Sequence, residues 1–385
     1  MKYDTVPLKS VLQPKGYIRG PFGSALKRGD MLETGVPVYE QQHAIYNSRT
    51  FRFFISPAKA IEMNRFAVEE NDLIISCSGT VGMVSLIQKN DPKGIISQAL
   101  LLLRVNPKIV DPVFLNYFFK SQEGYNSIIS RSSGSVQVNI SKRETIESIP
   151  IPLPPIDVQK KIAAILSALD EKIATNRAIN DNLQQQAAAL FSSLYDRSNT
   201  EVRFTDLIQI LGGGTPKTGE NTYWNGNIAF FTPKDVGTPY TLITEKTISK
   251  EGLSHCNSRL YPVNTVFVTA RGTVGKVGMS GVPMAMNQSC YALVGKETHQ
   301  LLVYFYTLKA VDRLKHKASG AVFDAITTRD FESEQIMKLS DDDATAFLRV
   351  AEPMFQEVLN NNIENLRLST LRDSLLPKLM SGEID

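Results

Sequence analysis

Two stretches of the chain share one seven-residue pattern of apolar positions. Apolar side chains recur every third and fourth residue between residues 162 and 194, and again between residues 347 and 379. The first seam comprises Ile162, Leu166, Leu169, Ile173, Asn176, Asn180, Leu183, Ala187, Leu190 and Leu194. The second comprises Phe347, Ala351, Met354, Val358, Asn361, Asn365, Leu368, Arg372, Leu375 and Leu379. This period predicts two long helices of about 40 residues each, roughly 60 Å long if continuous.

Both seams carry a pair of asparagines at the same two positions. A polar seam residue in a coiled coil lowers stability but fixes which residues pair. Antiparallel pairing of the two helices would place Asn176 opposite Asn365 and Asn180 opposite Asn361. Two alternatives remain open: the asparagines face solvent at a bend, or each helix packs only on its own domain. Arg372 is the one break in the repeated pattern.

Capping residues and prolines predict where the helices begin and end. Asp157 follows a proline-rich run and is a candidate N-cap for the first helix. Ser340 with Asp343 has the spacing of a capping box for the second. Pro353 and Pro377 predict that the second helix starts or kinks near the former and ends near the latter.

The segments before each helix consist of short apolar runs between turn residues, which predict strands with a few short helices. In the first segment the expected strands include Val36–Gln42, Phe51–Ile55, Leu73–Ser76, Val81–Ile87 and Ala99–Val105, followed by a helix over Val113–Ser121. The second segment repeats this order. Equivalent pieces are Gly20–Ser24 and Gly212–Lys217, Ser78–Gly82 and Arg271–Gly275, Ser97–Ala99 and Asn287–Ser289, and Ser133–Gly134 and Ser319–Gly320.

The repeat, with a period of about 185–190 residues, indicates a duplicated domain rather than a solenoid. We predict an α+β protein with two similar mixed α/β domains separated by two long antiparallel coiled-coil helices, related by a pseudo-two-fold axis. The expected boundaries are residues 1–150 for the first domain, 151–198 for the first helical spacer, 199–340 for the second domain and 341–385 for the second spacer. Such a chain would carry one globular domain at each end of the helix pair.

Charge is divided unevenly among these parts. Residues 1–150 carry 18 Lys and Arg against 13 Asp and Glu, and residues 197–340 carry 16 against 12, whereas residues 341–385 carry 4 against 9. Two basic domains at a fixed separation suit a ligand with two sites along a rigid axis, such as DNA. Three dispersed cysteines and four dispersed histidines predict no disulfide framework and no metal site. No long apolar run or signal peptide is present, so we expect a cytoplasmic protein without membrane contact.

No motif indicates catalysis. Gly214–Gly219 resembles a phosphate-binding loop, but Glu220 and Asn221 stand where that loop needs Lys and Ser or Thr. An adenine-methyltransferase tetrapeptide, a nuclease carboxylate–lysine set and a nucleophile triad are not recognisable in the sequence. The sequence therefore predicts a chain that is not an enzyme and binds no cofactor itself.

The two Gly-Thr-Val-Gly loops admit two interpretations. Their glycines either permit a tight hairpin turn or let the backbone approach another polymer closely. Gln and Asn side chains are the ones that read adenine in the major groove, and Lys, Arg, Ser and Thr contact phosphates. The candidate DNA contacts are Lys27, Gln41, Gln42, Ser78, Gly79, Thr80, Gln98, Lys217, Thr232, Lys234, Arg271, Gly272, Thr273, Lys276, Asn287 and Gln288.

These features together resemble the DNA-specificity subunit of type I restriction-modification systems. The resemblance covers essentially the whole chain and is strongest at Ile149–Pro155 with Gln159, at the paired Gly-Thr-Val-Gly loops and at the tail Ser374–Ile384. One departure is Lys338–Asp341, where the first half has its proline-rich lead-in.

The resemblance implies a non-catalytic reader of double-stranded DNA. Each target-recognition domain would read one half of a bipartite asymmetric site, and the helices would set the gap and dock two methyltransferase subunits. S-adenosylmethionine, ATP and Mg would be bound by those partners and by motor-nuclease restriction subunits. Alternatives are a related system with a fused methyltransferase-nuclease partner, a self-sufficient DNA enzyme, and a protein scaffold that does not bind DNA.

Overall fold

A computed structural model describes residues 3–22, 25–130, 139–140, 142–237, 239–317 and 325–384. Gly23, Ser24 and the equivalent pairs Ser133–Gly134 and Ser319–Gly320 lie outside these ranges. The chain forms two compact units. The first contains Met1–Glu171 with Leu368–Asp385, and the second contains Lys172–Arg367. Each unit is described separately below.

The first unit contains two main sheets. One has the order β2-β8-β5-β6, with every neighbouring pair antiparallel, and the other has the order β4-β3-β7, with β3 and β7 parallel. Its strands are β1 (Thr5–Pro7), β2 (Leu12–Arg19), β3 (Val36–Tyr39), β4 (Phe54–Ile55), β5 (Leu73–Ser76), β6 (Val84–Leu86), β7 (Ile95–Ile96), β8 (Leu100–Val105) and β9 (Pro150–Pro152). Its short helices are α1 (Gln41–Ile45), α2 (Pro57–Glu62), α3 (Pro112–Lys120), α4 (Gln122–Ile129) and α5 (Arg143–Glu147).

The second unit repeats this topology. The order β11-β18-β15-β16-β13 extends the pattern of the first main sheet by one strand, and β14-β12-β17 repeats the second, again with one parallel pair. Its strands are β10 (Thr200–Arg203), β11 (Ile208–Gly212), β12 (Trp224–Phe231), β13 (Tyr240–Thr241), β14 (Lys246–Ile248), β15 (Val266–Thr269), β16 (Val277–Ser280), β17 (Met284–Met286), β18 (Cys290–Gly295) and β19 (Gln335–Lys338). Its short helices are α7 (Phe204–Leu207), α8 (Lys250–Ser254), α9 (Gln300–Lys317) and α10 (Thr328–Glu332). The predicted duplication is therefore confirmed strand by strand.

The departure at Lys338–Asp341 is also explained by this duplication. In the first unit, β1 pairs with proline-rich β9 just before the long helix begins. In the second, β10 pairs antiparallel with β19 in the same place. Proline is tolerated in an edge strand but is not required there, so β19 can make this pairing without it. The second domain therefore joins its helix by the same route as the first.

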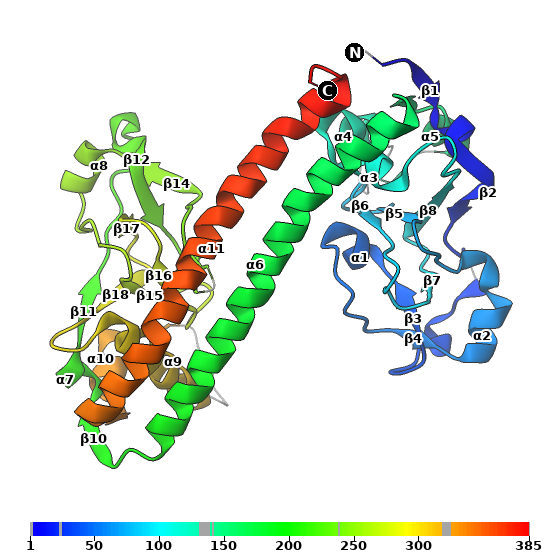
Figure 1. Cartoon of the computed structure of the whole chain (residues 1–385). Helices are drawn as coiled ribbons and strands as arrows, with labels where there is room; N and C mark the ends of the chain where they lie inside the picture. The colour runs from blue at the N-terminus through cyan, green and yellow to red at the C-terminus, as the bar shows by residue number, and fades with distance from the viewer. Residues whose placement is uncertain are drawn as a thin grey trace. The chain divides into compact units, whose positions relative to one another are not determined.

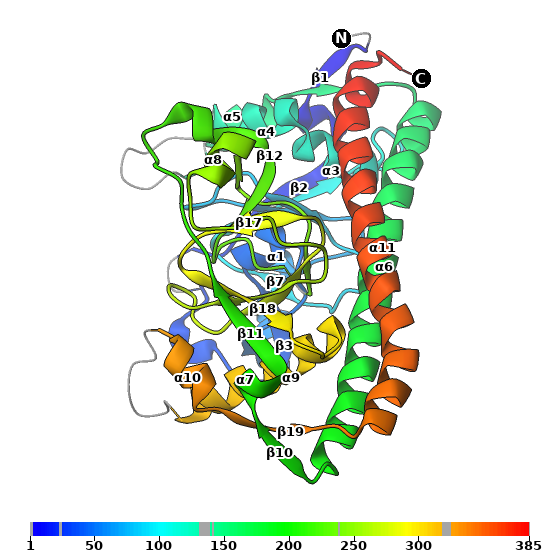
Figure 2. The same cartoon turned by 90° about the vertical axis from the view of Figure 1, so that its left-hand side faces the viewer.

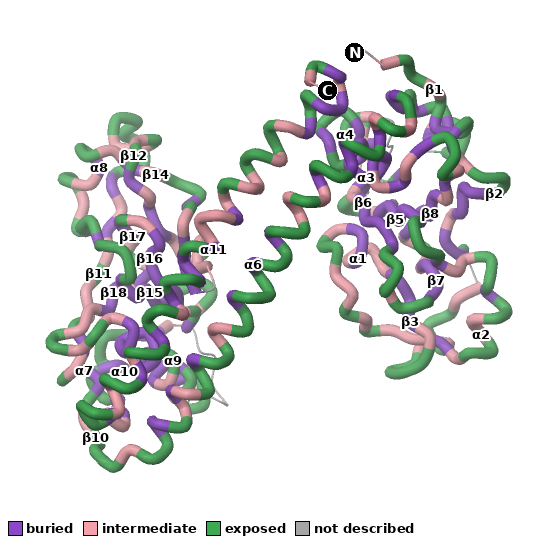
Figure 3. The backbone as a smooth tube through the Cα atoms, in the orientation of Figure 1, coloured by how far each residue is buried: buried purple, intermediate pink, exposed green. Residues whose placement is uncertain are grey.

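The two predicted long helices are α6 (Ile156–Asp196) and α11 (Asp341–Ser381), each of 41 residues. They run side by side in both views (Figure 1, Figure 2). All ten positions of each predicted seam are buried or half-buried, and exposed positions alternate with them along both helices (Figure 3). The heptad pattern therefore identified the packed face of each helix correctly.

The asparagines pair across the helices as the antiparallel register predicts. Asn176 Nδ2 donates to Asn365 Oδ1 at 3.0 Å, and Asn361 Nδ2 donates to Asn180 Oδ1 at 2.9 Å. All four side chains are at most 9% exposed, which excludes the interpretation that they face solvent. Buried amides cost free energy unless they are bonded, so any other register would leave them opposite apolar side chains.

Arg372, the break in the seam, forms an ion pair in the first unit. Its Nη1 lies 2.6 Å from Asp170 Oδ1. The hydroxyl of Tyr117 in α3 donates to the other oxygen of the same carboxylate at 2.7 Å. An apolar residue at position 372 would leave this half-buried carboxylate without its cation, which accounts for the departure from the pattern.

The helix ends differ in part from the predictions. Ser340 does cap α11, accepting the Asp343 N–H at 3.1 Å. Asp157 is not a cap, because α6 already begins at Ile156 and the Pro155 carbonyl accepts the first helical bonds. Helix α11 begins well before Pro353 and continues past Pro377 to Ser381. Both prolines are exposed, so the carbonyls that lose a partner can bond to water.

Each helix end also packs into the core of its unit. In the first unit, Ile162, Leu166 and Leu379 belong to the cluster that contains the apolar strands β5 and β8. In the second, Phe191 and Phe347 belong to the cluster formed by β15, β18 and α9. The helices therefore pack both on each other and on the domains, where the sequence had suggested a choice between the two.

Candidate nucleic-acid interface

The Gly-Thr-Val-Gly loops are tight hairpins between β5 and β6 and between β15 and β16. All four glycines have positive φ: Gly79 at 67°, Gly82 at 86°, Gly272 at 81° and Gly275 at 73°. L-residues rarely adopt this region, so glycine is required at each position. The predicted role of the motif as a turn is confirmed.

The two glycines of each hairpin have different surroundings. A Cβ at Gly79 would meet no atom within 4 Å, and one at Gly272 would meet only Pro233 Cβ at 4.0 Å. By contrast, a Cβ at Gly275 would lie 2.6 Å from Lys315 Cε. The first glycine of each hairpin, with an exposed threonine after it, leaves open space over the backbone. That space permits the close approach of another polymer.

The segment that follows the neighbouring strand contacts each hairpin. In the first unit, Gln41 Oε1 accepts the Ser78 N–H at 3.0 Å. In the second, the Thr273 hydroxyl donates to the Pro233 carbonyl at 3.3 Å. Because β3 and β12 are equivalent strands, the same two loops meet in both units.

In the second unit these loops line a groove of about 540 Å³. Its lining comprises Thr232, Pro233, Lys234, Glu245, Lys246, Gly272, Thr273, Lys276 and Asn287. Six of the nine residues predicted for this domain are therefore brought together here. Lys234 Nζ and Glu245 Oε2 are 3.7 Å apart and both exposed, so this ion pair is weak and its lysine stays accessible.

The other three predicted residues of the second unit lie outside this lining. Arg271 is exposed on the same hairpin and its backbone pairs with Ala325. Gln288 accepts a hydrogen bond from Thr215. The Lys217 carbonyl accepts the Trp224 indole N–H at 3.1 Å. Lys217 and Gln288 thus belong with the glycine-rich loop after β11 rather than with the groove.

The predicted residues of the first unit are less tightly gathered. Gln41 and Ser78 are bonded to each other, and Gly79, Thr80 and Gln98 are exposed. Gln41 and Gln42 were expected at the end of a strand but lie on helix α1, whose five residues are too few to show a helical period. The Lys27 N–H is bonded to Asp30 in a separate turn.

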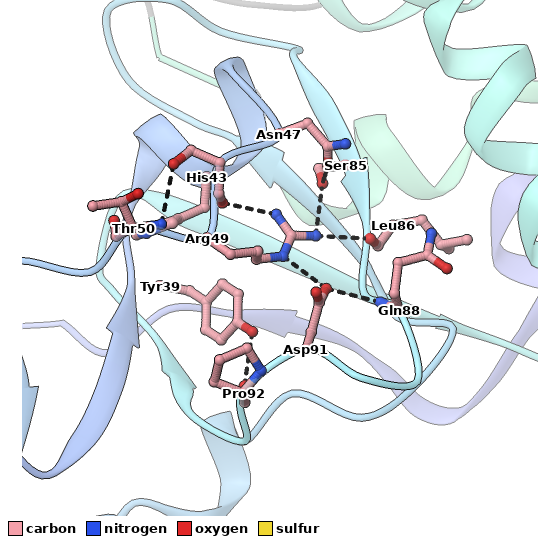
Figure 4. Close-up of polar contacts among 11 residues, drawn as sticks. Tyr39, His43, Asn47, Arg49, Thr50, Ser85, Leu86, Gln88, Asp91 and Pro92 are labelled. Carbon is pink, nitrogen blue, oxygen red and sulfur yellow. Dashed lines mark hydrogen bonds and ion pairs between the residues drawn. The ribbon is translucent and has the colours of Figure 1, made fainter. Parts of the chain in front are cut away.

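His43 holds the start of α1 in place (Figure 4). The Glu40 N–H lies 2.7 Å from His43 Nδ1, and Nε2 lies 3.0 Å from the Thr50 carbonyl. These partners assign a neutral ring that accepts at Nδ1 and donates at Nε2. The ring is fully buried and stacks on Phe51 with centroids 4.5 Å apart. Burial lowers the pKa of His43 below its ordinary value of 6.5; the Glu40 carboxylate opposes this and the Arg49 guanidinium adds to it.

Arg49 fixes the segment after α1 (Figure 4). Its Nε lies 2.7 Å from Asp91 Oδ2, and its Nη2 donates to the Ser85 hydroxyl at 3.2 Å and to the Leu86 carbonyl at 2.9 Å. Asn47 accepts a further bond from the Ser85 hydroxyl at 2.5 Å. The helix that carries Gln41 is therefore held at both ends, which restricts where its side chains can point.

We expect replacement of His43 by Asn to remove a pH dependence from the first domain. The folded domain favours the neutral ring, so below pH 6.5 the unfolded chain binds the proton more readily. Stability should be full above pH 6.5 and fall as the pH drops towards the lowered folded pKa. His43→Asn should lose this response and cost about 1–3 kcal/mol at pH 7, because the stacked ring is lost.

Urea unfolding at pH 5 and pH 7 measures both effects. His316→Asn, which replaces an exposed histidine of α9, should retain the wild-type response. An unchanged pH response in His43→Asn would show that His43 is not the group responsible.

Residues 26–185 and 197–338 of this chain match the model of a protein family, the type I restriction modification DNA specificity domain. The chain belongs to this family. The two matched segments correspond to the two duplicated domains, the first together with most of α6.

Three known proteins resemble the chain over different shares of its length. The type I restriction enzyme HindI specificity subunit of Haemophilus influenzae is 24% identical over 374 residues, covering 75% of this chain and 81% of that protein. The MjaIX specificity subunit of Methanocaldococcus jannaschii is 29% identical over 127 residues, covering 31% and 29%. The crystal structure of a type I restriction-modification S subunit from M. genitalium covers 98% of this chain and 96% of its own, with a TM-score of 0.66 and 15% identity. This likeness supports the shared fold.

Among the described residues, no group of three or more His, Cys, Asp or Glu side chains could hold a metal ion. Burial raises the pKa of the Cys77 and Cys290 thiols to about 12, so neither is a ready nucleophile. None of the described helices is both long and apolar enough to span a bilayer.

Sequence reasoning missed several residues of the interface. Lys246 lines the groove from β14, and Lys315 reaches the second hairpin glycine from α9. Neither belongs to a loop motif, and only the strand register of β12 with β14 brings Lys246 to this place. His43 is one of the four histidines for which the sequence predicted no metal site, and its position three residues after Glu40 was the available signal for a cap.

Proposed function

We propose that the chain is the DNA-specificity subunit of a type I restriction-modification complex, in which each duplicated domain reads one half of a bipartite site. The observation that carries this proposal is the recurrence of one open hairpin with its neighbouring turn on both domains, joined by a helix pair of defined register. Two equivalent but differently equipped loops suit two different half-sites. In the second unit the groove is lined by lysines, threonines and an asparagine, side chains suited to phosphates and base edges.

The same proposal assigns the chemistry to partners. Methyltransferase subunits that carry S-adenosylmethionine would dock on the helices, and motor-nuclease subunits would bring ATP and Mg. The related system with a fused methyltransferase-nuclease partner would use the chain in the same way, and a pull-down of its partners separates the two. A scaffold that does not bind DNA is the rival from another class; salt-sensitive binding of duplex DNA by the full chain contradicts it.

We expect exchange of residues 1–150 for the equivalent part of a relative to change one half-site only. The hairpin contacts of each domain are formed within that domain, so the second reading surface stays intact. Methylome sequencing of cells that carry the exchanged gene gives both half-sites at once. The reciprocal exchange of residues 199–340 is the matched control. A simultaneous change of both half-sites would contradict independent reading.

The purified chain alone is expected to transfer no methyl group to DNA. This follows from the absence of a recognisable cofactor motif in the sequence. Radiolabelled S-adenosylmethionine and duplex DNA measure the transfer, with the chain plus its methyltransferase subunits as the positive control. Incorporation by the chain without partners would favour the self-sufficient enzyme instead.

A further inference from the structure

The two hairpin regions differ in charge at equivalent positions. Strands β3 and β12 end at Tyr39 and Phe231, and the third residue after each strand is Gln42 in the first unit and Lys234 in the second. The residue after the second hairpin glycine is Met83 in the first unit and Lys276 in the second.

The strand partners differ in the same direction. Phe54 pairs with Pro37 in the first unit, and Thr247 pairs with the equivalent Ala229 in the second. The preceding residue is therefore Phe53 in the first unit and Lys246 in the second. Lys246 Nζ lies 5.6 Å from the centroid of the Trp224 ring, which holds the cation at the groove.

The helix behind each hairpin adds to the contrast. A Cβ at Gly82 would meet Tyr125, Ile128 and Ile129 side chains of α4 at 3.3–3.4 Å. At the equivalent Gly275 the nearest side chain is that of Lys315, with Nζ 3.4 Å from the same point. An apolar and aromatic support in the first unit is thus replaced by Lys315 and Val311 in the second.

Acidic groups reduce this difference without removing it. The Asp235 carboxylate lies beside the groove, where it accepts hydrogen bonds from Thr232 and from the Glu245 N–H. Among the residues that line the second-unit groove, Glu245 is the one acid and faces three lysines. In the first unit, the equivalent region has Arg52 bonded through two nitrogens to Glu40 at 2.7 and 2.8 Å. The Glu40 carboxylate therefore neutralises Arg52, and Gln42 Nε2 donates to the same carboxylate at 3.5 Å.

We propose that the second domain supplies most of the phosphate-directed, salt-dependent affinity for DNA, while the first domain reads its half-site through neutral groups. This inference rests on the proposed function. Each lysine that neutralises a phosphate releases counterions and steepens the fall of affinity with salt, whereas an amide–base contact does not. The two half-sites are therefore held by different physical forces.

The test measures binding of the full chain to a 40-base-pair duplex of random sequence between about 50 and 300 mM KCl. The double variant Lys234→Gln with Lys276→Met installs the residues that the first domain carries at these positions. The slope of log affinity against log salt changes by about 0.9 per phosphate contact. Because the double variant removes two such contacts, its slope should be shallower than that of the wild type by about 1.8. Affinity at 100 mM salt should fall roughly 10- to 60-fold.

Two control variants separate this effect from a general loss of charge. Lys296→Gln removes a lysine from the opposite end of β18, where Nζ bonds to the Thr205 carbonyl. Lys108→Gln removes an exposed lysine just after β8, the equivalent strand of the first domain, and Lys108 is not among the candidate DNA contacts. Both should leave the slope within about 0.3 of the wild type, since neither lysine is expected to neutralise a phosphate. Thermal unfolding of every variant verifies that the fold is retained.

The outcomes distinguish this inference from the proposed function. Wild-type chain that shows no salt-dependent binding of duplex would contradict DNA binding itself. Wild-type binding with an unchanged slope in the folded double variant would overturn the asymmetry alone. The asymmetry would also be overturned if Lys27→Gln, which removes the one lysine among the candidate contacts of the first domain, made the slope shallower by about 0.9 or more. A shallower slope in the double variant, with both controls unchanged, supports it.

Discussion

Inserting one heptad into each long helix is expected to widen the recognised gap between the half-sites by about three base pairs. Seven residues add about 10 Å at 1.5 Å per residue, and DNA rises about 3.4 Å per base pair. The insertions belong after Leu183 in α6 and before Val358 in α11, on the same side of the Asn pairs. Both seams then stay in phase and Asn176 keeps its bond to Asn365.

Methylome sequencing of cells that carry the lengthened gene measures the gap directly. The half-sites should stay the same, because no hairpin was altered, whereas affinity should fall, since three base pairs also rotate one half-site relative to the other. A four-residue insertion in each helix puts the seams out of phase and should abolish recognition. An unchanged gap with full methylation would show that the helices do not set the distance.

Replacing Phe191 by Ala is expected to destabilise the second unit by about 3–5 kcal/mol. This ring of α6 is 1% exposed and stacks on Phe305 of α9 with centroids 4.9 Å apart. It also meets Tyr306 and Phe347 edge-on, each at 5.5 Å. The substitution therefore empties the contact that joins both long helices to the domain.

Urea unfolding followed by far-ultraviolet circular dichroism measures this loss, and the two units are expected to unfold in separate transitions. Ile179→Ala, on an exposed position of the same helix, should cost less than about 1 kcal/mol. A loss below 1 kcal/mol for Phe191→Ala would mean that the cluster does not anchor the domain. Recognition of the second half-site should weaken before that of the first.

The features that the sequence predicted well are those with a long period or an internal copy. The seams and their Asn pairs recur over more than four heptads, so their pairing followed from arithmetic on the residue numbers. The hairpins were found because Gly79 and Gly82 have counterparts in Gly272 and Gly275. Because the domain is duplicated, each half of the chain could be compared with the other.

What the sequence did not yield depends on contacts between distant segments. Helix α1 has five residues and is held by His43 and Arg49 through partners that lie outside it, so local pattern predicted a strand there. Pro353 was expected to limit α11, but tertiary packing of Ala351 and Phe355 on either side outweighs one lost hydrogen bond. Lys246 is a groove residue only because of the register of β14.

The pairing of Asn176 with Asn365 also sets a problem of timing during synthesis. Helix α6 is complete at Asp196, but the end of its partner α11 is reached at Ser381, 185 residues later. At about 5–20 residues per second, a ribosome takes roughly 10–40 s to supply that partner. Through this interval the apolar seam of α6 has no α11 to pair with. Packing of this seam on a purely apolar surface would bury its two central amides without hydrogen bonds, which costs free energy. The polar layer that fixes the finished register thus also protects the unfinished chain from pairing with the wrong surface.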